Sequence, residues 1–378
     1  MYTRHMVRSH RFRLRLCFVA LLVFSLCSVA FILTRGNLLI SILQRTEKFS
    51  VEMSGTKLDF QEMHDQHPNN SNTNCQKDKF EDILLVIVFV ELIYDTIPYL
   101  EKLYRHQFPN IVYCGPEKSF ADKLEYTIIF VDMLRGVTAY ECLSAATRSH
   151  PGFGGYFFIR NDLFFNFWNV ANYSRSLIWE SSEQLGNQVM FEQPRDTWIW
   201  WYTPWGLQAC EGAYRDVVYL NDEYKRAIID KKDQTWDVGN SLNALLWNGR
   251  GTNMCYRGFA NLFYIPSEHV TAFEKLSFIF QKHQVYMEIA VPTIIRMLEL
   301  SEKTKKLSGI DLGSLFGEER AQNDDSLLLR YLTSNVTYIR PVVHKRKFSA
   351  ESRTNILIHT LVNRLNQFNQ SYCAGLFS

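Results

Sequence analysis

The stretch GGYFFIRNDL, from Gly154 to Leu163, predicts the central strand of an α/β fold. A short apolar run that follows glycines and ends at polar residues is typical of a buried strand. In α/β folds, ligands bind at the carboxyl ends of parallel strands, where the connecting loops diverge and leave a crevice. Asp162 therefore stands where such an enzyme would place a ligand for a metal or a nucleotide sugar. The alternative is that this Asp only caps the next helix.

Strands and helices alternate before that stretch. The continuous aliphatic run Ile83–Val90 predicts a strand buried on both faces. Apolar residues at helical spacing predict a helix over 96–106, and a strand follows at 111–114. A further strand over 126–131 and a helix over 139–148 continue the pattern. Alternation of this kind predicts an α/β fold with a mostly parallel sheet covered on both faces.

The composition indicates a globular chain. Of its 378 residues, 47% are hydrophobic and 14% aromatic, which supplies enough apolar surface for a sizeable core. The 41 basic and 39 acidic residues leave a net charge of +2. Because nucleic-acid-binding proteins carry clustered basic surface, this near balance predicts no nucleic-acid partner.

The N-terminal region predicts a membrane anchor. Residues 16–33 are apolar and uncharged, which is long enough for a helix to cross a lipid bilayer. Several arginines precede this run and one follows closely, so the positive-inside rule leaves the tail 1–15 in the cytoplasm. We expect a signal anchor over 16–35 and a polar stem over 36–79, with the rest lumenal. The alternative is a signal peptide cleaved near Ser28–Ala30 and a secreted product.

Glycosylation signals and cysteines agree with a lumenal location. The Asn-X-Ser/Thr pattern marks glycosylation acceptors. It occurs at Asn69, Asn172, Asn335 and Asn369. Outside the membrane run the cysteines are Cys75, Cys114, Cys142, Cys210, Cys255 and Cys373. This even number is compatible with up to three disulfides in an oxidising lumen, although the pairing is not readable and some could be buried thiols.

Residues 197–205 gather four tryptophans in an irregular segment. Such rings suit carbohydrate contact, because a flat face meets sugar C–H groups while a polar edge stays free to bond. We interpret the segment as an insertion with short helices that forms an acceptor-side surface; the alternative is a core or lid cluster. Beyond it we predict a charged helix over 214–232, short strand or loop pieces over 241–247 and 261–266, and an amphipathic helix over 269–283.

Glu288 is the one acid in the apolar stretch 286–292, ahead of a helix that runs to about residue 300. A carboxylate among apolar residues is costly unless it is paired or has a function. Glu288 is therefore our candidate for a general base or an acceptor-binding group. The alternative is a Glu on the exposed face of a helix start, where the helix dipole favours it.

His344 lies in a basic cluster near the C-terminus. A His can ligate a metal, and the neighbouring Lys345 and Lys347 could offset the charge of a diphosphate. The alternative is an ordinary surface loop.

Several segments together resemble the STELLO-like family, single-pass Golgi proteins with a glycosyltransferase-like domain and the signature GFLF..DD..LNYWNL…LW. A later family element reads HPxKLS. The matching blocks are GYFFIRND at 155–162, NFWN at 166–169, LIW at 177–179, LFYIP at 262–266, EIAVP at 288–292 and HKRKFS at 344–349. The resemblance implies a GT-A-like (Rossmann-like) nucleotide-sugar-binding domain over 80–350, followed by a C-terminal helical tail over 351–378. It also implies type II topology in the Golgi membrane.

One departure from the family pattern concerns the metal. The resemblance implies a divalent cation, Mn²⁺ or Mg²⁺, that bridges the donor diphosphate, with Asp162 as ligand, Asn161 assisting and His344 as a further ligand. The family has an acidic pair where this chain has Asn161 and Asp162. An Asn lowers the ligand charge but still offers a carbonyl oxygen to a hard cation. The Pro of HPxK is also replaced.

Two functions follow from the sequence. The first is a Golgi glycosyltransferase that moves a sugar from a nucleotide-sugar donor to a lumenal glycan or glycoprotein. The second is a catalytically inactive glycosyltransferase-like scaffold that binds other Golgi membrane proteins. Asn161 favours the second.

Overall fold

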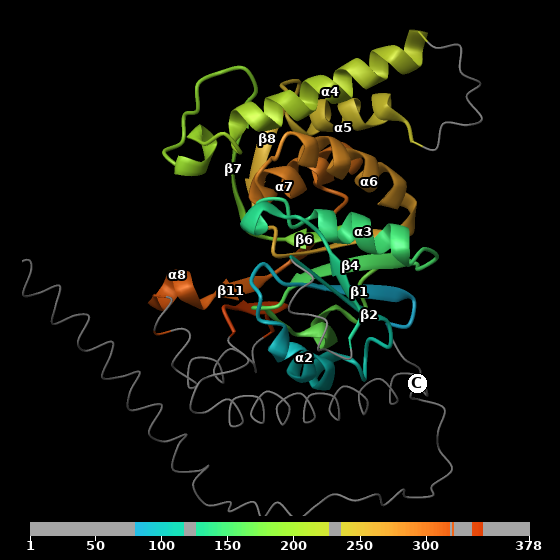
Figure 1. Cartoon of the computed structure of the whole chain (residues 1–378). Coiled ribbons are helices and arrows are strands. Elements are labelled where there is room, and N and C mark those ends of the chain that lie inside the picture. The colour runs from blue at the N-terminus through green and yellow to red at the C-terminus, as the bar shows by residue number, and fades with distance from the viewer. Residues whose placement is uncertain (1–79, 117–125, 227–235, 318–319, 321–334, 343–378) are drawn as a thin grey trace, which may run out of the picture. The chain divides into compact units, whose positions relative to one another are not determined.

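The computed structural model describes residues 80–116, 126–226, 236–317, 320 and 335–342, all within one compact unit, Asn72–Ser378 (Figure 1). The predicted cytoplasmic tail, signal anchor, stem and C-terminal tail lie outside these residues. Within the described ranges, no helix combines the length and apolarity that a membrane span requires.

A seven-stranded sheet forms the centre of the described unit, in the order β10-β6-β9-β4-β1-β2-β3. Only β9 runs antiparallel to the others, because it pairs antiparallel with both β4 and β6. The strands are β1 (Ile83–Val88), β2 (Ile111–Gly115), β3 (Ile128–Phe130), β4 (Gly155–Arg160), β6 (Trp179–Ser181), β9 (Leu262–Pro266) and β10 (Lys305–Leu307). The predicted α/β fold with a mostly parallel sheet is confirmed, and the stretch that begins at Gly154 is its middle strand.

Position 155 has to be glycine because of the neighbouring strand. The ring of Tyr264 on β9 lies against β4, and a Cβ on Gly155 would come within 2.0 Å of the Tyr264 hydroxyl oxygen. The glycine therefore lets β9 pair closely with the central strand.

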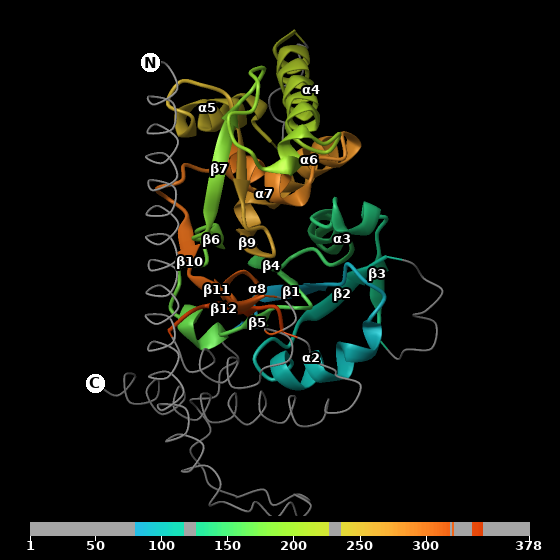
Figure 2. The ribbon, with the colours of Figure 1, turned by 90° about the vertical axis from the view of Figure 1, so that its left-hand side faces the viewer.

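Helices cover both faces of the sheet (Figures 1 and 2). Alternate residues of β1 belong to two separate cores, one shared with α2 and the other with α3, α6 and α7. Helices α4 and α5 lie beyond α6 and α7, farther from the sheet (Figure 1). The α-helices are α2 (Ile97–Tyr104), α3 (Glu141–Ser149), α4 (Leu207–Arg226), α5 (Val238–Asn248), α6 (Ser267–Lys282), α7 (Met287–Leu298) and α8 (Leu312–Phe316). The 3₁₀ turns are η2 (Tyr94–Thr96), η3 (Leu134–Gly136), η4 (Phe167–Val170) and η5 (Ile199–Tyr202).

Two small sheets complete the described fold. One joins β11 (Gly309–Asp311), β12 (Tyr338–Arg340) and β5 (Phe164–Phe165), and the other pairs β7 (Gln184–Val189) with β8 (Met254–Gly258). Because β12 pairs with β5, which follows β4 closely, the chain returns to the end of the central strand. There the Val342 amide donates a hydrogen bond to the Asp162 carbonyl oxygen at 2.7 Å.

The structure corrects one sequence prediction. Residues 241–247 are not a strand or loop piece but belong to helix α5. Asp237 caps this helix, since its side chain accepts a hydrogen bond from the Asn240 amide at 3.0 Å. The predicted helix over 214–232 begins earlier, at Leu207, as part of α4.

Two disulfides confirm the oxidised cysteines that the sequence predicts. Cys114 on β2 pairs with Cys142 on α3, and Cys210 on α4 pairs with Cys255 on β8. Each bond joins a helix to a strand. Cys75 and Cys373 lie outside the described residues.

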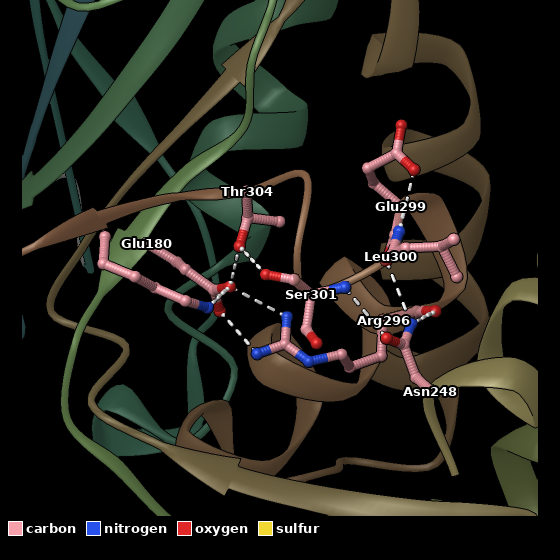
Figure 3. Close-up of polar contacts among 8 residues, drawn as sticks. Glu180, Asn248, Arg296, Glu299, Leu300, Ser301 and Thr304 are labelled. Atoms are coloured by element: carbon pink, nitrogen blue, oxygen red, sulfur yellow. Dashed lines mark hydrogen bonds and ion pairs between the residues drawn. The ribbon is translucent and has the colours of Figure 1, made fainter. Parts of the chain in front are cut away.

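A buried ion-pair network ties α7 to the edge of the main sheet (Figure 3). Arg296 of α7, 2% exposed, donates two hydrogen bonds to the Glu180 carboxylate on β6, at 2.9 and 3.1 Å. Thr304 donates to the same carboxylate at 2.6 Å, and Lys306 of β10 also pairs with it. Burial by itself raises the pKa of Glu180, but Arg296 and Lys306 outweigh it and hold that pKa below its usual value.

Hydrogen bonds from Asn248 also hold the C-terminal end of α7, as Figure 3 shows. The Asn248 side-chain amide, at the end of α5, donates to the carbonyl oxygens of Arg296 and Glu299, at 2.8 and 3.0 Å (Figure 3). The Asn248 side-chain oxygen accepts a hydrogen bond from the Ser301 backbone N–H at 2.9 Å. Helix α7 is thus held by hydrogen bonds to β6 on one side and to α5 at its end.

Replacing Arg296 tests the network. Arg296→Met leaves the Glu180 carboxylate buried without its bidentate partner, so we expect the free energy of unfolding of the full-length chain to fall by about 3–5 kcal/mol. The double variant Glu180→Leu/Arg296→Met removes both charges and should recover most of that loss. Urea unfolding followed by circular dichroism measures both. Arg148→Met, which breaks a pair whose Arg side chain is 52% exposed, is the control and should cost less than about 1 kcal/mol. If Arg296→Met is as stable as Arg148→Met, the Arg296–Glu180 pair does not hold α7 to the sheet.

Candidate functional site

Charged side chains gather where the central strand ends, and Arg160 and Asp162 are the first of them. Arg160 is the last residue of β4 and Asp162 follows two residues later. The Arg160 guanidinium contacts the Asp162 carboxylate through Nε at 3.2 Å and Nη2 at 3.3 Å. Arg160 Nη1 also donates to the side-chain oxygen of buried Asn261 at 3.3 Å. The predicted ligand position therefore carries an ion pair, with both side chains partly open to solvent.

Arg340 reaches the same place from the end of β12. Its guanidinium lies 3.7 Å from the Asp162 carboxylate and 3.6 Å from that of Asp311. These separations are too long for hydrogen bonds, so both contacts are purely ionic. The guanidinium also lies over the Phe259 ring, 5.6 Å from its centroid. Arg340 thus bridges two carboxylates and keeps hydrogen-bonding capacity.

Arg257 on β8 is the third cation of the group. It pairs with Asp196 at 2.9 Å and lies over the Trp198 ring, 4.4 Å from its centroid. Asp196 in turn accepts a hydrogen bond from the Trp198 amide at 2.9 Å. Arg257 therefore connects the two-stranded sheet of β7 and β8 to the tryptophan-rich segment 197–205. We call Arg160, Asp162, Asp196, Arg257, Glu288, Asp311 and Arg340 the arginine–carboxylate cluster.

Glu288 lies in the first turn of α7 and is partly buried rather than exposed, unlike the typical acid at a helix start. Burial raises the pKa of its carboxyl, and nearby Asp311 adds to the rise, while Arg340, Arg160 and Arg257 oppose it. Within the part of the chain that the structure describes, this carboxylate makes no hydrogen bond or ion pair. A buried carboxyl with a raised pKa and no fixed partner is suited to accept a proton.

Donor atoms without partners concentrate in the cluster. The Nε atoms of Arg160, Arg257 and Arg340 are buried and donate no hydrogen bond within the described residues. The side-chain nitrogen of Asn261, a residue that is 1% exposed, is in the same state. The Asp162 Oδ1 atom also lacks a hydrogen bond, although it lies 3.2 Å from Arg160 Nε. Because buried donors are normally satisfied, the donors that remain, above all those of Arg257 and Arg340, are suited to a ligand with acceptor oxygens.

A small cavity opens next to Arg257. It measures about 20 Å³ and lies between β6, β8, β9 and the second half of α7. A cavity of that size holds one water molecule. It links the cluster to the Glu180–Arg296 network, because both Arg257 and Arg296 line it.

The structure brings some predicted site residues together and leaves others untested. Asp162 and Glu288 meet through their shared neighbours Arg160 and Arg340. Asn161 is 4% exposed, and its backbone N–H donates a hydrogen bond to the Val88 carbonyl oxygen at 3.0 Å.

The predicted residues His344, Lys345 and Lys347 lie outside the described residues. Of the predicted glycosylation sites, Asn172 and Asn335 are exposed, and Asn69 and Asn369 are outside the described residues. All four stay predictions.

The described residues fit a divalent metal poorly. Asp162 already faces two guanidinium groups, whose charge opposes that of a cation. Within the described ranges, no group of three His, Cys, Asp or Glu side chains is arranged to hold a metal ion. A metal would need His344, which is not described, so the metal stays a prediction.

Sequence reasoning missed five members of the cluster as site residues: Arg160, Asp196, Arg257, Asp311 and Arg340. Arg160 had a usable signal, since it lies in the stretch that predicts the central strand, directly before Asn161. Arg257 and Arg340 had none, because each is an isolated basic residue brought to the site by β8 or β12.

Comparisons with known proteins give distant structural matches alone. No family model and no curated protein sequence matches the chain. Similar solved structures include the mannosyltransferase Ktr4p from S. cerevisiae in complex with GDP, with 14% identity, a TM-score of 0.30 and coverage of 65% of this chain and 74% of that chain. The apo structure of the bifunctional glycosyltransferase WbbM has 12% identity, a TM-score of 0.35 and coverage of 74% and 50%. Both are glycosyltransferases, but likeness at this level identifies no reaction and does not confirm the STELLO-like resemblance.

The raised pKa of Glu288 makes stability depend on pH in a defined direction. Between the ordinary pKa of an unfolded Glu and the raised folded value, the folded chain binds more protons, so stability falls as the pH rises through that window. Glu288→Gln removes this loss. We expect the variant to have a higher melting temperature than the unchanged protein at pH 8 and an equal one at pH 4. Exposed Glu302 supplies the control Glu302→Gln, which should show no such divergence. A melting-temperature difference for Glu288→Gln that is the same at both pH values would refute the assignment.

Proposed function

We propose that the protein is a glycosyltransferase that moves a sugar from a nucleotide-sugar donor to a glycan or glycoprotein acceptor. The observation that carries the proposal is the arginine–carboxylate cluster at the carboxyl end of β4, which combines three guanidinium groups whose Nε atoms make no hydrogen bond within the described residues with the proton-accepting Glu288. Ligands of α/β folds bind at this end of the strands. The resemblance of the sequence blocks to a family with a glycosyltransferase-like domain supports the same reaction.

The arginines would hold the donor diphosphate. Guanidinium groups bind phosphate oxygens through charge-assisted hydrogen bonds, and Arg suits this role because its donors form a fixed fork. Arg160, Arg257 and Arg340 approach from three different strands. They would offset the charge that grows on the diphosphate as it leaves, which is electrostatic stabilisation of the transition state.

Glu288 would take the proton from the acceptor. In a direct displacement, the acceptor hydroxyl oxygen forms a bond to the anomeric carbon of the donor sugar, and its proton passes to the Glu288 carboxylate. The bond between that carbon and the phosphate oxygen breaks, and the nucleoside diphosphate leaves with the electron pair. A raised pKa makes the carboxylate a stronger base for this step.

The remaining expectations belong to this proposal. We place the chain in the Golgi membrane as a single-pass type II protein with its C-terminal domain lumenal, on the strength of residues 16–35 and the sequons. Its partners would then be the lipid bilayer, a nucleotide sugar and a lumenal acceptor. Lys345 and Lys347 would add positive charge for the diphosphate. A Mn²⁺ or Mg²⁺ ion, if bound, would supply Lewis-acid chemistry with Asp162, Asn161 and His344 as its ligands.

A second candidate is the catalytically inactive scaffold that binds other Golgi membrane proteins. One observation favours it: the single carboxylate at the metal position is neutralised by Arg160 and Arg340. A scaffold of this kind would need neither a nucleotide nor Glu288.

Nucleotide binding distinguishes the two functions. We expect calorimetry on the full-length chain to detect UDP or GDP binding, and Arg340→Met to weaken it by about 10- to 100-fold, since a hydrogen bond to a charged group contributes about 1.5–3 kcal/mol. Glu288→Gln should bind the nucleotide and lose transfer. Arg148→Met is the surface control, and titrations with and without Mn²⁺ report on the metal. A folded protein that binds no nucleoside diphosphate in either condition would favour the scaffold.

A further inference from the structure

The aromatic segment 198–205 is fixed against the arginine–carboxylate cluster from two sides. At its start, Trp198 packs under the Arg257 guanidinium. At its end, the Trp205 carbonyl oxygen accepts a hydrogen bond from the Tyr286 amide at 2.9 Å. Between these points Trp200 stacks on the Tyr286 ring, with centroids 4.5 Å apart and planes 15° apart. Tyr286 precedes Glu288 by two residues, and the charge of Glu288 acts on its hydroxyl, so the Tyr286 ring lies near the proposed base.

The segment is built as a rigid surface. Residues Ile199–Tyr202 form the short helix η5, and Thr203 ties back to the Trp200 carbonyl oxygen through its hydroxyl at 2.9 Å. A Cβ at Gly206 would come within 2.0 Å of that same carbonyl oxygen, so the turn needs glycine. The Tyr202 hydroxyl donates to the carbonyl oxygens of Pro194 and Asp196, at 3.2 and 3.0 Å. Binding to these rings would therefore need little ordering.

One tryptophan of the segment is fully buried in the core, and the others are partly exposed. Trp201 is 2% exposed and belongs to the core under α3, α6 and α7. Trp198, Trp200 and Trp205 keep part of their surface in solvent, as does Tyr286. Core packing thus explains Trp201 and part of the burial of Trp198 and Tyr286, whereas Trp200 and Trp205 are not among the residues that pack against that core.

The aromatic surface and the arginines suit different ligands. The guanidinium groups suit an anion, whereas aromatic faces suit the C–H face of a pyranose ring, and Trp and Tyr edges remain able to hydrogen-bond sugar hydroxyls. The Tyr286 hydroxyl is such an edge, and burial, with a contribution from Glu288, raises its pKa to about 12. The two surfaces adjoin at Arg257 and at Glu288.

We infer that Trp198, Trp200, Trp205 and Tyr286 form a platform that binds a pyranose ring of the acceptor and presents its hydroxyl to Glu288. The inference rests on the proposed function and adds the acceptor subsite and its residues. The acceptor is therefore a glycan that offers an uncharged sugar ring, and it binds without the nucleotide.

Saturation-transfer NMR on the full-length chain tests the platform. The probes are methyl glycosides of mannose, galactose, glucose and N-acetylglucosamine, each at millimolar concentration and without nucleotide. We expect at least one glycoside to bind, and Trp200→Ala to weaken that binding on the order of tenfold. Trp200→Phe, which keeps an aromatic face, should retain most of it. The matched control is Trp247→Ala, since Trp247 on α5 is 75% exposed and belongs to neither the cluster nor the aromatic segment.

Calorimetry with UDP, GDP and a nucleotide sugar of each, on the same samples, separates the two proposals. If nucleotide binds but no glycoside does, or if Trp200→Ala binds the glycoside as well as the unchanged protein, the platform is wrong and the proposed function stands. If Trp200→Ala weakens a nucleotide sugar but not the matching nucleoside diphosphate, the rings bind the donor sugar and the acceptor assignment is overturned. Loss of glycoside binding in Trp200→Ala alone, with nucleoside diphosphate binding retained, is the result that the platform predicts.

Discussion

The buried pair between Arg296 and Glu180 is the interaction on which the proposed site depends. It joins α7 to β6, and β10 joins in through Lys306. Since α7 is continuous from Met287 to Leu298, with Pro292 inside it, the pair acts on its first turn together with the hydrogen bonds that the Tyr286 and Met287 amides donate to Trp205 and Val137. The N-terminal end of α7 carries Glu288 and follows directly on Tyr286. One buried ion pair therefore positions both the proposed base and one ring of the proposed acceptor platform.

Charge balance explains the state of Glu288. Within the cluster, the arginines Arg160, Arg257 and Arg340 each face an aspartate, and Glu288 faces none of them in an ion pair within the described residues. Glu288 is the acid left over, and burial raises its pKa. An anionic diphosphate bound beside it would raise that pKa further, because a nearby like charge disfavours ionisation. The affinity of Glu288 for a proton would then be greatest when the donor is in place.

The sequence predicted the fold well where patterns are local and poorly where contacts are distant. The aliphatic run of β1 and the stretch Gly154–Leu163 each identify a buried strand. The length of an apolar run, and in the second case the glycines before it, are local signals. Helix α5 was missed because a short apolar run suits strand or helix, and the Asp237 cap that settles the choice lies outside it. In the site, Asp162 and Glu288 were selected from sequence. Arg257 and Arg340 were not, since they reach the site only through the pairing of β8 with β7 and of β12 with β5 and β11.

The central claim is that the arginines of the cluster bind the diphosphate of a nucleotide-sugar donor. An experimental structure of the full-length chain with a bound nucleoside diphosphate tests it most directly. The account predicts phosphate oxygens within hydrogen-bonding distance of Arg160, Arg257 and Arg340, with their Nε atoms as donors. A nucleotide bound elsewhere on the chain, with the cluster unchanged, would contradict the account.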